Sequence, residues 1–536
     1  MANQSNWLPH LKHALPNEAY SGKISMYAVA LEGWRRGLTL RIYNIFNEQK
    51  VQTKYSLSYN GREHKFDWSK GDKVSDEAFN ICNDKMLTKE YLLKANIPTP
   101  LGRSFTADDV DDNVVEYAKS LGFPVVLKPK DGRFGKGVIT DIKDVNELRD
   151  ALKYVRQELN YPDVIVEQFI SGQDYRIYVV DGVVISAIKR IPANIVGDGK
   201  NSIKQLIRKK NNERKNTPHL RKRPIKIDKE VQDMLKSLGL TLESIPAKGE
   251  RIFLRKISNV SAGGDSIEVT DSLTQELKDI AIKTSEAIPG LGQCGIDLLV
   301  DENSHSFVVI EVNARAGLGS LLFPYKGQAK DIPKAIIDFY FPETKGRSLN
   351  NIKKTFYFDL DSILHVLQTG IVEEVCVPNL PMTDNVATKG YVVKGWNKKI
   401  GPRHWVQQRA RYLKLHGFVE ILNNGDALIV VAGDVKKLEI YESILLSKLP
   451  DKAEVESIQW DKPIKAGFHI GGPFQVGSSQ VMSKDVQELR AEKKEIQEKL
   501  EQYRKKYKKV INSRLWRYTG PVRKFGDIIK RIIWKR

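Results

Sequence analysis

The chain has 536 residues, of which 41% are hydrophobic and 28% charged, a composition typical of globular proteins and long enough for about three to five domains. It contains no run of about 18 apolar residues, which argues against a membrane-spanning helix, and its first residues do not resemble a signal peptide. The three cysteines, Cys82, Cys294 and Cys376, lack metal-ligand spacing, which argues against a zinc site and a disulfide framework. These features predict a soluble, cytoplasmic protein.

The net charge of +20 is unevenly distributed along the chain. Residues 501–536 contain 13 Lys or Arg and two acidic residues, and a second basic cluster lies between Lys200 and Lys226. Such clusters attract nucleic acid, anionic lipid or small anions. A solvated surface explains each cluster equally well.

Residues 1–80 mix helical periodicity with strand-like runs, which predicts a small α/β unit ahead of the main domain. From residue 81, long helices alternate with short β-rich runs at 123–128, 164–167 and 175–180. An Asp-Gly pair separates the last run from another at 183–187, a spacing typical of a two-residue hairpin. A second hairpin is expected between 295–300 and 307–313. The pattern from 81 to 345 therefore indicates one α/β domain.

The pattern changes after residue 345. A connecting segment (346–389) leads to a compact β-α-β unit at 390–462, and Gly-rich residues 463–482 predict a linker. Apolar residues at 3-4 spacing over 483–512 indicate a coiled coil, or an amphipathic helix packed on its own protein. The last residues, 513–536, predict a basic amphipathic segment suited to a membrane surface or an acidic partner.

Three closely spaced glycines, Gly132, Gly135 and Gly137, follow the strand that ends at Lys128-Pro129. Glycines at this spacing allow backbone N–H groups to approach phosphate oxygens. The segment matches neither the P-loop nor the dinucleotide fingerprint. On its own, such a turn is more often structural.

The second hairpin predicts a metal site. Strand alternation places Glu311 and Asn313 on one face, and the hairpin brings Asp297 opposite Glu311. Three oxygen ligands without His or Cys suit Mg²⁺ or Mn²⁺. A solvated strand face is the alternative, but facing Asp and Glu side chains repel each other without a cation.

Taken in order, these segments resemble an ATP-grasp ligase over about residues 80–330. The resemblance rests on Lys85 and its neighbours, the Lys128 strand, the Gly-rich loop and the segments 166–172, 295–297 and 311–313. The segments 189–193, 196–199 and 259–264 are most similar to the cyanophycin synthetase and bifunctional glutathione synthetase branch. The resemblance implies an ATP-grasp fold and a ligase that forms an amide through an acyl phosphate, using ATP and one or two Mg²⁺ or Mn²⁺ ions.

The resemblance also implies roles for individual residues. The phosphates of ATP would contact Lys85, Lys128 and the Gly-rich loop. Adenine and ribose would contact Glu167, Phe169, Ile170 and Asp174. The metal ligands would be Asp297, Glu311 and Asn313, and the charge of the transferred phosphoryl group would be stabilised by Arg190, Arg255 and Arg176. A surface ion pair is the alternative for each of these arginines.

One departure from the family concerns the substrate side. Relatives often have Pro-Gly after the metal-binding asparagine, whereas this chain continues with Ala-Arg-Ala-Gly at 314–317. This segment usually borders the acceptor site, so we expect Arg315 to bind an anionic substrate, with Ser261 on the same side. The carboxylate donor and the amine acceptor, small molecules or polymers, stay open.

Residues 390–462 resemble acylphosphatase, which implies a ferredoxin-like α/β sandwich. Arg403 stands at the family's phosphate-binding arginine, and 417–419 match its Gly-Trp-Val motif. Ile421 replaces the asparagine that positions the attacking water, and Pro402 removes a backbone N–H from the phosphate loop. We therefore expect this domain to bind or scaffold, with acyl-phosphate hydrolysis as the alternative.

Other functions agree less well with the sequence. A nucleotide sensor would not need both the metal ligands and the phosphate lysines, and no nucleic-acid-binding module accompanies the basic clusters, so we expect no nucleic-acid partner. Residues 513–523 are similar to segments that end bacterial surface-polysaccharide glycosyltransferases. This similarity predicts a ligase at the inner face of the plasma membrane that modifies a cell-surface polymer or its precursor, forming homo-oligomers through the coiled coil.

Overall fold

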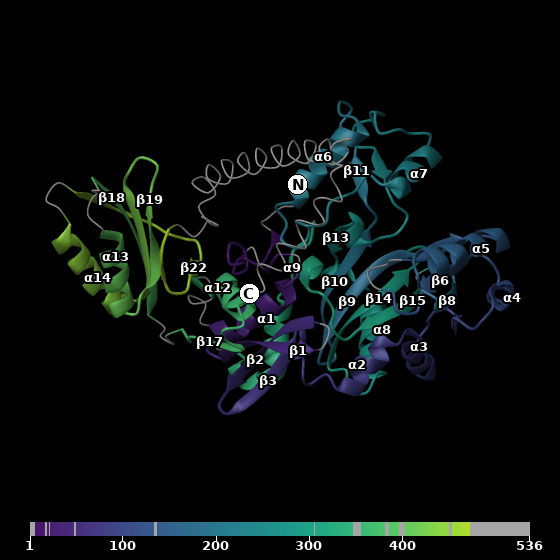
Figure 1. Cartoon of the computed structure of the whole chain (residues 1–536), viewed down its shortest axis with the longest axis horizontal. Coiled ribbons are helices and arrows are strands. Elements are labelled where there is room, and N and C mark those ends of the chain that lie inside the picture. The colour runs from purple at the N-terminus through teal and green to yellow at the C-terminus, as the bar shows by residue number, and fades with distance from the viewer. Residues whose placement is uncertain are drawn as a thin grey trace, which may run out of the picture.

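The computed structural model describes residues 6–16, 19–20, 22–47, 50–132, 137–304, 306–346, 355–380, 385–395, 402–449 and 453–471. The predicted coiled coil and basic tail lie outside these residues and remain predictions. The described elements form a mixed α/β protein whose sheets are spread along its long axis (Figure 1). Within these ranges, no helix is long and apolar enough to cross a bilayer.

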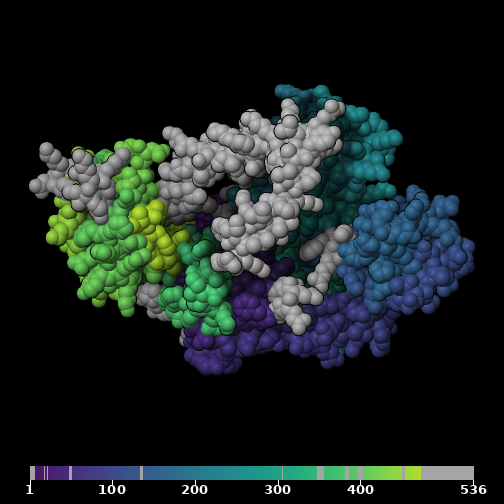
Figure 2. All heavy atoms as spheres, viewed as in Figure 1, coloured from purple at the N-terminus to yellow at the C-terminus, as the bar shows by residue number. Residues whose placement is uncertain are grey.

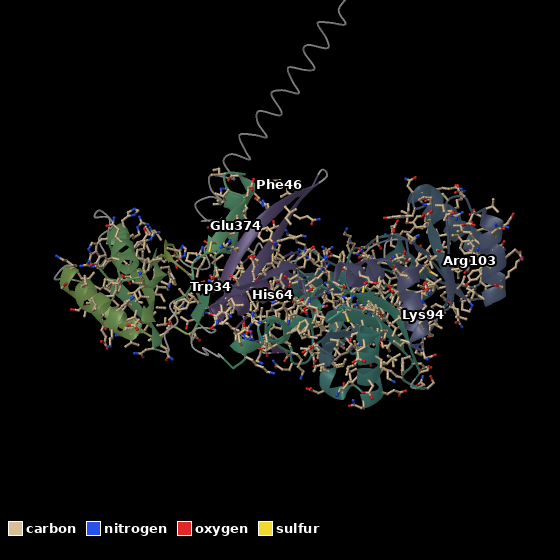
Figure 3. All side chains as sticks on the ribbon, turned by 90° about the horizontal axis from the view of Figure 1, so that it is seen from below. Trp34, Phe46, His64, Lys94, Arg103 and Glu374 are labelled. Carbon is tan, nitrogen blue, oxygen red and sulfur yellow. The ribbon has the colours of Figure 1, made fainter. Side chains whose placement is uncertain are left out.

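The N-terminal sheet combines the start of the chain with a much later segment. In sheet order its strands are β17 (Glu374–Val377), β1 (Thr39–Asn47), β2 (Lys50–Tyr59), β3 (Arg62–Asp67) and β4 (Lys70–Gly71). β17 lies in the expected connecting segment and pairs antiparallel with β1, so that Tyr43 faces Glu374. Figure 3 shows Phe46 and Glu374 at one end of this sheet. The first 80 residues therefore do not form this sheet alone.

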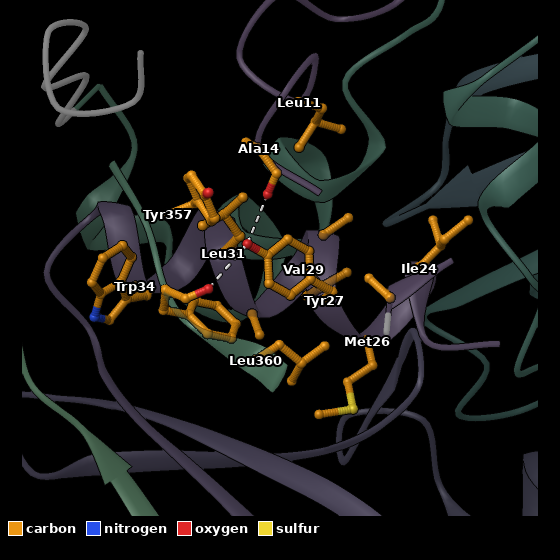
Figure 4. Packing of buried hydrophobic residues seen from close by; sticks show 14 of the residues in the cluster. Leu11, Ala14, Ile24, Met26, Tyr27, Val29, Leu31, Trp34, Tyr357 and Leu360 are labelled. Carbon is orange, nitrogen blue, oxygen red and sulfur yellow. Dashed lines mark hydrogen bonds between the residues drawn. The ribbon is translucent and has the colours of Figure 1, made fainter. Parts of the chain in front are cut away.

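A single core joins this sheet to the segments that follow the central domain. Every residue of α1 (Ile24–Arg35) is buried, and the helix packs against α10 (Ile332–Tyr340). The buried Tyr27 hydroxyl donates to the carbonyls of Ala14 (2.8 Å) and Phe358 (3.4 Å), as Figure 4 shows. Leu360, the first residue of α12 (Leu360–Gln368), is buried in the same hydrophobic cluster. Residues before 40 and after 355 thus stabilise one another.

The central sheet contains both predicted hairpins. Its strands, in order, are β13 (Asp265–Glu268), β10 (Val183–Ile191), β9 (Gln173–Val180), β14 (Gln293–Val300) and β15 (Phe307–Asn313). Asp181 and Gly182 have positive φ (50° and 68°), as a two-residue hairpin turn requires. In the second hairpin Asp297 pairs with Glu311 and Gly295 with Asn313, which confirms the predicted register. One side of the sheet is covered by α8 (Gln275–Glu286).

Two smaller units flank the central sheet. The small lobe contains β5 (Gly102–Phe105), β8 (Val164–Gln168), β6 (Val125–Pro129) and β7 (Ile139–Ile142), with helices α4 (Asp111–Leu121) and α5 (Val145–Lys153). The insert (residues 192–264) contains β11 (Asn194–Val196), β12 (Arg251–Phe253), α6 (Ile203–Arg214) and α7 (Lys229–Ser237). Helices α2 (Asp76–Asn83) and α3 (Lys85–Lys94) contact β15. Lys94 and Arg103 mark this end of the molecule in Figure 3.

The C-terminal domain is an α/β sandwich at the opposite end of the molecule (Figure 2). Its sheet order is β21 (Glu454–Ile458), β18 (Val386–Lys394), β20 (Ala427–Asp434), β19 (His416–Ile421) and β23 (Phe468–Ile470). The contacting helices α13 (Pro402–Tyr412) and α14 (Val435–Lys448) pack on it. A further strand, β22 (Ile464–Lys465), pairs with β16 (Phe356–Tyr357) and ties this domain to the rest. Both β22 and β23 lie in the segment expected to be a linker.

Candidate active site

A cluster of arginines and carboxylates occupies one face of the central sheet. Asp297 on β14 accepts two hydrogen bonds from Arg176 on β9 (2.7 and 2.8 Å) and one from Arg190 on β10 (2.9 Å). Strand pairing places Arg176 directly beside Asp297. Burial alone would raise the pKa of Asp297, but the two guanidinium groups outweigh it and lower the pKa. Asp297 is therefore ionised at neutral pH.

Glu311 and Asn313 lie on β15 beside this cluster. Burial and the neighbouring charge of Asp297 raise the pKa of Glu311, although Arg176, Lys85 and Lys128 act in the opposite direction. The side-chain Nδ2 of Asn313 is buried and has no hydrogen-bond partner. Two facing carboxylates are an arrangement that a cation would stabilise, whereas the unpaired Nδ2 of Asn313 is a donor that needs an acceptor oxygen.

These three side chains fit a hard divalent cation. Their donors are carboxylate and amide oxygens, the ligands that Mg²⁺ and Mn²⁺ prefer. Among the described residues, no group of three His, Cys, Asp or Glu could hold a metal ion, and the candidate set contains only two carboxylates. Because both Asp297 oxygens accept from guanidinium groups, a bound cation would compete with Arg176 and Arg190.

Asp174, expected at the ribose, accepts from Arg190 (3.0 and 3.3 Å) in the structure. Arg190 thus bridges Asp174 and Asp297. Burial, together with the charge of Asp297, raises the pKa of Asp174 to about 6. A ribose hydroxyl would therefore share this carboxylate with Arg190.

Across from this face, the small lobe holds a buried carboxylate between two lysines. Glu167 on β8 pairs with Lys128 on β6 (2.6 Å) and with Lys89 on α3 (2.7 Å). Burial opposes ionisation of Glu167, but the two lysines prevail and lower its pKa. Lys89 was not predicted from the sequence, although its position one helical turn after Lys85 was a usable signal. Both oxygens of Glu167 form ion pairs with these lysines. The carboxylate therefore orients Lys128, in addition to the adenine contact that the resemblance implies.

Lys85 begins α3, whose N-terminus is capped by the Asp84 side chain. Its Nζ donates to the Lys130 carbonyl (2.6 Å) and lies 3.5 Å from that of Gly132. Burial and the charge of Lys128 lower the pKa of Lys85. The lysine is therefore held at the start of the Gly-rich loop, where a bound anion would raise its pKa again.

Two glycines of this loop are described, and Gly135 lies outside the described residues. Gly137 has a φ of 75°, and a Cβ there would lie 2.8 Å from the Pro129 ring. The position therefore needs glycine for both conformation and space.

The predicted adenine-binding backbone follows β8. The N–H of Phe169 donates to the Pro124 carbonyl (3.2 Å), so its backbone offers only a carbonyl to an incoming base. Ile170, the next residue, is partly exposed.

Comparisons with known proteins identify two domains in the chain. A family model described as a RimK-like ATP-grasp domain matches residues 82–206 and 255–338, and an acylphosphatase model matches 389–470. The chain contains a RimK-like ATP-grasp domain and an acylphosphatase domain. The gap in the first match (207–254) falls within the insert.

Two curated relatives and one solved structure illustrate the similarity. The glutathione biosynthesis bifunctional protein of Mannheimia succiniciproducens is 30% identical over 60% of this chain and 43% of its own length. Cyanophycin synthetase of Trichormus variabilis is 31% identical over 60% of this chain and 36% of its own length. A crystal structure of a bifunctional glutathione synthetase from Pasteurella multocida is 29% identical, with a TM-score of 0.42, over 56% of this chain and 41% of that one. The chain therefore spans less than half the length of these relatives.

Two predicted residues lie away from the arginine–carboxylate cluster, in the insert of the ATP-grasp domain. Arg255 forms ion pairs with Asp228 and Glu230, the contacts expected of the structural alternative. Ser261 lies in the short helical turn Val260–Ala262, where its N–H donates to the Asn259 side chain (2.8 Å). Direct contact of Arg255 with a phosphoryl group would require both ion pairs to break.

Arg315 is held by the N-terminal sheet. Its guanidinium donates to Asp67 (2.7 Å) and lies 5.4 Å from the centre of the Trp68 ring. Ser69 donates to the Ala316 carbonyl (2.7 Å). Trp68 has a positive φ of 57°, an uncommon conformation for a bulky residue. The turn after β3 therefore fixes the loop after Asn313, a contact with no signal in the sequence.

In the acylphosphatase domain, Arg403 is exposed near the start of α13. Ile421, at the position of the water-orienting asparagine, packs against the hydrophobic core of the domain. An apolar, partly buried side chain cannot hold a water molecule in place. The family's phosphate-binding arginine is thus present without its catalytic partner.

Proposed function

We propose that this protein is an ATP-dependent carboxylate–amine ligase that forms an amide through an acyl phosphate. The observation that carries the proposal is that the predicted metal ligands and the predicted phosphate-binding lysines lie close enough to interact. Asp297, Glu311 and Asn313 share one face of the central sheet, and the charges of Lys85 on α3 and Lys128 on β6 act on Glu311. Relatives named for glutathione and cyanophycin synthesis support this assignment.

In the proposed reaction, an oxygen of the donor carboxylate attacks the γ-phosphorus of ATP and ADP leaves. The amine nitrogen then attacks the acyl carbon, inorganic phosphate leaves and the nitrogen loses a proton. No protein nucleophile is needed. The protein contributes by positioning the reactants and stabilising charge, which is where catalysis of phosphoryl transfer lies.

Each charged residue has a defined task in this scheme. Lys85, Lys128 and the Gly-rich loop neutralise and cover the phosphates. Arg190 and Arg176 release Asp297 and turn to the transferred phosphoryl group, which carries more exposed charge than the carboxylate. Asp297, Glu311 and Asn313 would hold Mg²⁺, which would supply neutralisation of the phosphate charge. Arg315 and Ser261 border the acceptor.

We assign the acylphosphatase domain a binding or scaffolding role. Ile421 supports this assignment because it removes the group that would orient an attacking water. A hydrolytic domain beside the ligase would also destroy any acyl phosphate that escapes.

We further propose that the substrate is a cell-surface polymer or its precursor, met at the inner face of the plasma membrane. The support is the similarity of 513–523 to the ends of surface-polysaccharide glycosyltransferases, together with the charge of 501–536. Deleting residues 513–536 is expected to move the protein from the membrane pellet to the supernatant. An unchanged distribution would refute the membrane contact.

The ligase proposal is tested by Mg²⁺-dependent release of phosphate from ATP. The full chain is incubated with a panel of amino acids, small peptides and cell-envelope polymers. The proposal predicts that a donor and an amine together stimulate release well above ATP alone. ATP binding without stimulation by any member would favour a nucleotide sensor.

A further inference from the structure

The basic segment, residues 200–226, contains 11 Lys or Arg and one acidic residue, Glu213. It therefore contributes a net charge of +10, half of the formal charge of the chain. The segment comprises α6 and the loop after it, within the insert of the ATP-grasp domain (Figure 1). Its charge is not used by the proposed nucleotide and metal contacts.

The charge on α6 is directed outward. The helix buries Ile203, Leu206 and Ile207 in the core of the insert, which leaves Lys204, Arg208 and Lys209 exposed. Lys204 lies 3.9 Å from Glu243, and within the described ranges no acidic side chain lies within 4.0 Å of Arg208 or Lys209. Like charges four residues apart, such as Lys204 and Arg208, destabilise a helix. The helix thus retains repulsion that an acidic residue would remove.

Some exposed basic residues on other helices of this protein have acidic neighbours. Lys94 pairs with Glu90 (2.7 Å), Lys119 with Glu116 (2.8 Å) and Arg149 with Asp112 (2.6 Å). Within the described part of the chain, unpaired lysines occur on other helices too, so α6 is distinguished by the density of charge in its segment, 11 basic residues to one acidic residue.

Buried members of the segment tie it to the substrate side of the ATP-grasp domain. Arg214, at the end of α6, donates to the carbonyls of Val260, Gly263 and Gly264 at 3.0–3.1 Å. These carbonyls belong to the loop that includes Ser261. β13 follows that loop, and its Ser266 pairs with Arg190. One end of α6 is thus a single loop away from the arginine–carboxylate cluster.

The loop after α6 lies against the region that follows Arg315. A Cβ on Gly319 would lie 2.7 Å from that of His219. Lys210 lies 5.4 Å from the Tyr325 ring, and Arg221 lies 5.2 Å from the ring of Tyr20. The basic segment therefore borders both segments that we assign to the acceptor region, residues 259–264 and 315–326.

We propose that the basic segment binds an extended polycarboxylate chain whose end is the substrate of the ligase, an inference that rests on the proposed function. Charge complementarity favours a polyanion over a neutral or basic chain. The segment contains no Phe, Tyr or Trp on which nucleic-acid bases could stack. The apolar face of α6 is buried, so it is not available to enter a lipid surface.

The test uses the full chain and fluorescent poly-L-glutamate, without ATP. The charge-reversal variant Lys204→Glu/Arg208→Glu/Lys209→Glu is expected to bind the polymer at least about tenfold more weakly than wild type. The control, Lys283→Glu/Lys436→Glu/Lys448→Glu, has the same change in net charge on α8 and α14 and is expected to stay within about twofold of wild type. Both variants retain the basic tail, so its contribution cancels.

Equal loss of binding in the two triple variants would overturn the proposal, because net charge alone would then explain it. Unchanged binding in the α6 variant would overturn it as well. The same two triple variants are also compared for binding to duplex DNA and to anionic phosphatidylglycerol vesicles. If the α6 variant loses binding to DNA or vesicles, and wild type does not bind poly-L-glutamate, the proposal of a polycarboxylate ligand is refuted. Because ATP is absent, failure of the ligase chemistry would leave this binding result intact and distinguishable.

Discussion

Replacing Glu311 with glutamine is expected to lower Mg²⁺-dependent turnover by at least about 10³-fold, while the metal-free protein becomes no less stable. The loss corresponds to about 4 kcal/mol of transition-state stabilisation, the order expected when a metal ligand is removed. Glutamine keeps the size of the side chain and removes its charge. The substitution therefore lowers turnover but does not lower the stability of the metal-free protein.

The stability effect follows from the electrostatics of the metal-free site. Burial and Asp297 raise the pKa of Glu311, so the folded state binds its proton more tightly than the unfolded state does. For a carboxyl group with a raised pKa, the stability present at low pH is lost as the pH rises through the folded-state pKa. Above that pH the ionised side chain thus weakens the fold, and Glu311→Gln removes this penalty.

Thermal unfolding with and without Mg²⁺ and ATP tests both effects together. Wild type is expected to gain stability from the added ligands, and the Glu311→Gln variant to gain clearly less. Glu302→Gln is the matched control, because Glu302 is an exposed carboxylate that pairs with Lys189 and Tyr175. Turnover of Glu311→Gln within tenfold of wild type would contradict the assigned metal role.

Replacing Glu167 with glutamine is expected to destabilise the protein by about 3–5 kcal/mol, because it leaves two buried lysines without a counter-charge. Lys128 and Lys89 both pair with this carboxylate, and the side chains of all three are less than 10% exposed. Affinity for ATP is expected to fall as well, because Lys128 loses the partner that orients it.

The Glu167 effect has a predictable pH dependence. The two lysines lower the pKa of Glu167 in the folded state despite its burial. The stability that the carboxylate contributes is therefore present above its unfolded-state pKa of about 4.3 and lost as the pH falls through the lower folded-state value. Wild type and Glu167→Gln should differ most at neutral pH and converge in acid.

Chemical denaturation of wild type and Glu167→Gln at several pH values measures this difference. Glu302→Gln again provides the comparison, and it is expected to cost at most about 1 kcal/mol, the range of exposed ion pairs. A loss for Glu167→Gln as small as that of the control would show that the buried triad contributes little.

The sequence predicted those parts of the site that depend on local chain geometry. A two-residue Asp-Gly turn sets the β9–β10 register, and alternation along two hairpin strands places Asp297 opposite Glu311. Both rules act over a few residues. The ordered motifs then identified the ATP-grasp and acylphosphatase domains that the family models match.

Contacts between distant segments were not predictable in the same way. β17 joins the N-terminal sheet although more than 300 residues separate it from β1. The four residues of β17 contain no sequence pattern that indicates pairing with β1. Asp67 holds Arg315 across 248 positions, and Arg255 is paired with acids of α7 and its N-cap. The sequence offers several acidic residues as possible partners for each arginine, and tertiary packing determines which of them forms the ion pair.

The central claim is that this protein activates a carboxylate as an acyl phosphate, and hydroxylamine trapping tests it most directly. Hydroxylamine attacks an acyl phosphate to give a hydroxamate, which is measured by its iron complex in the presence of ATP, Mg²⁺ and the donor panel. The account predicts hydroxamate with at least one donor, dependent on ATP and Mg²⁺ and absent with Glu311→Gln. ATP consumption that rises with a donor and an amine but yields no hydroxamate, or hydroxamate that persists in Glu311→Gln, would contradict it.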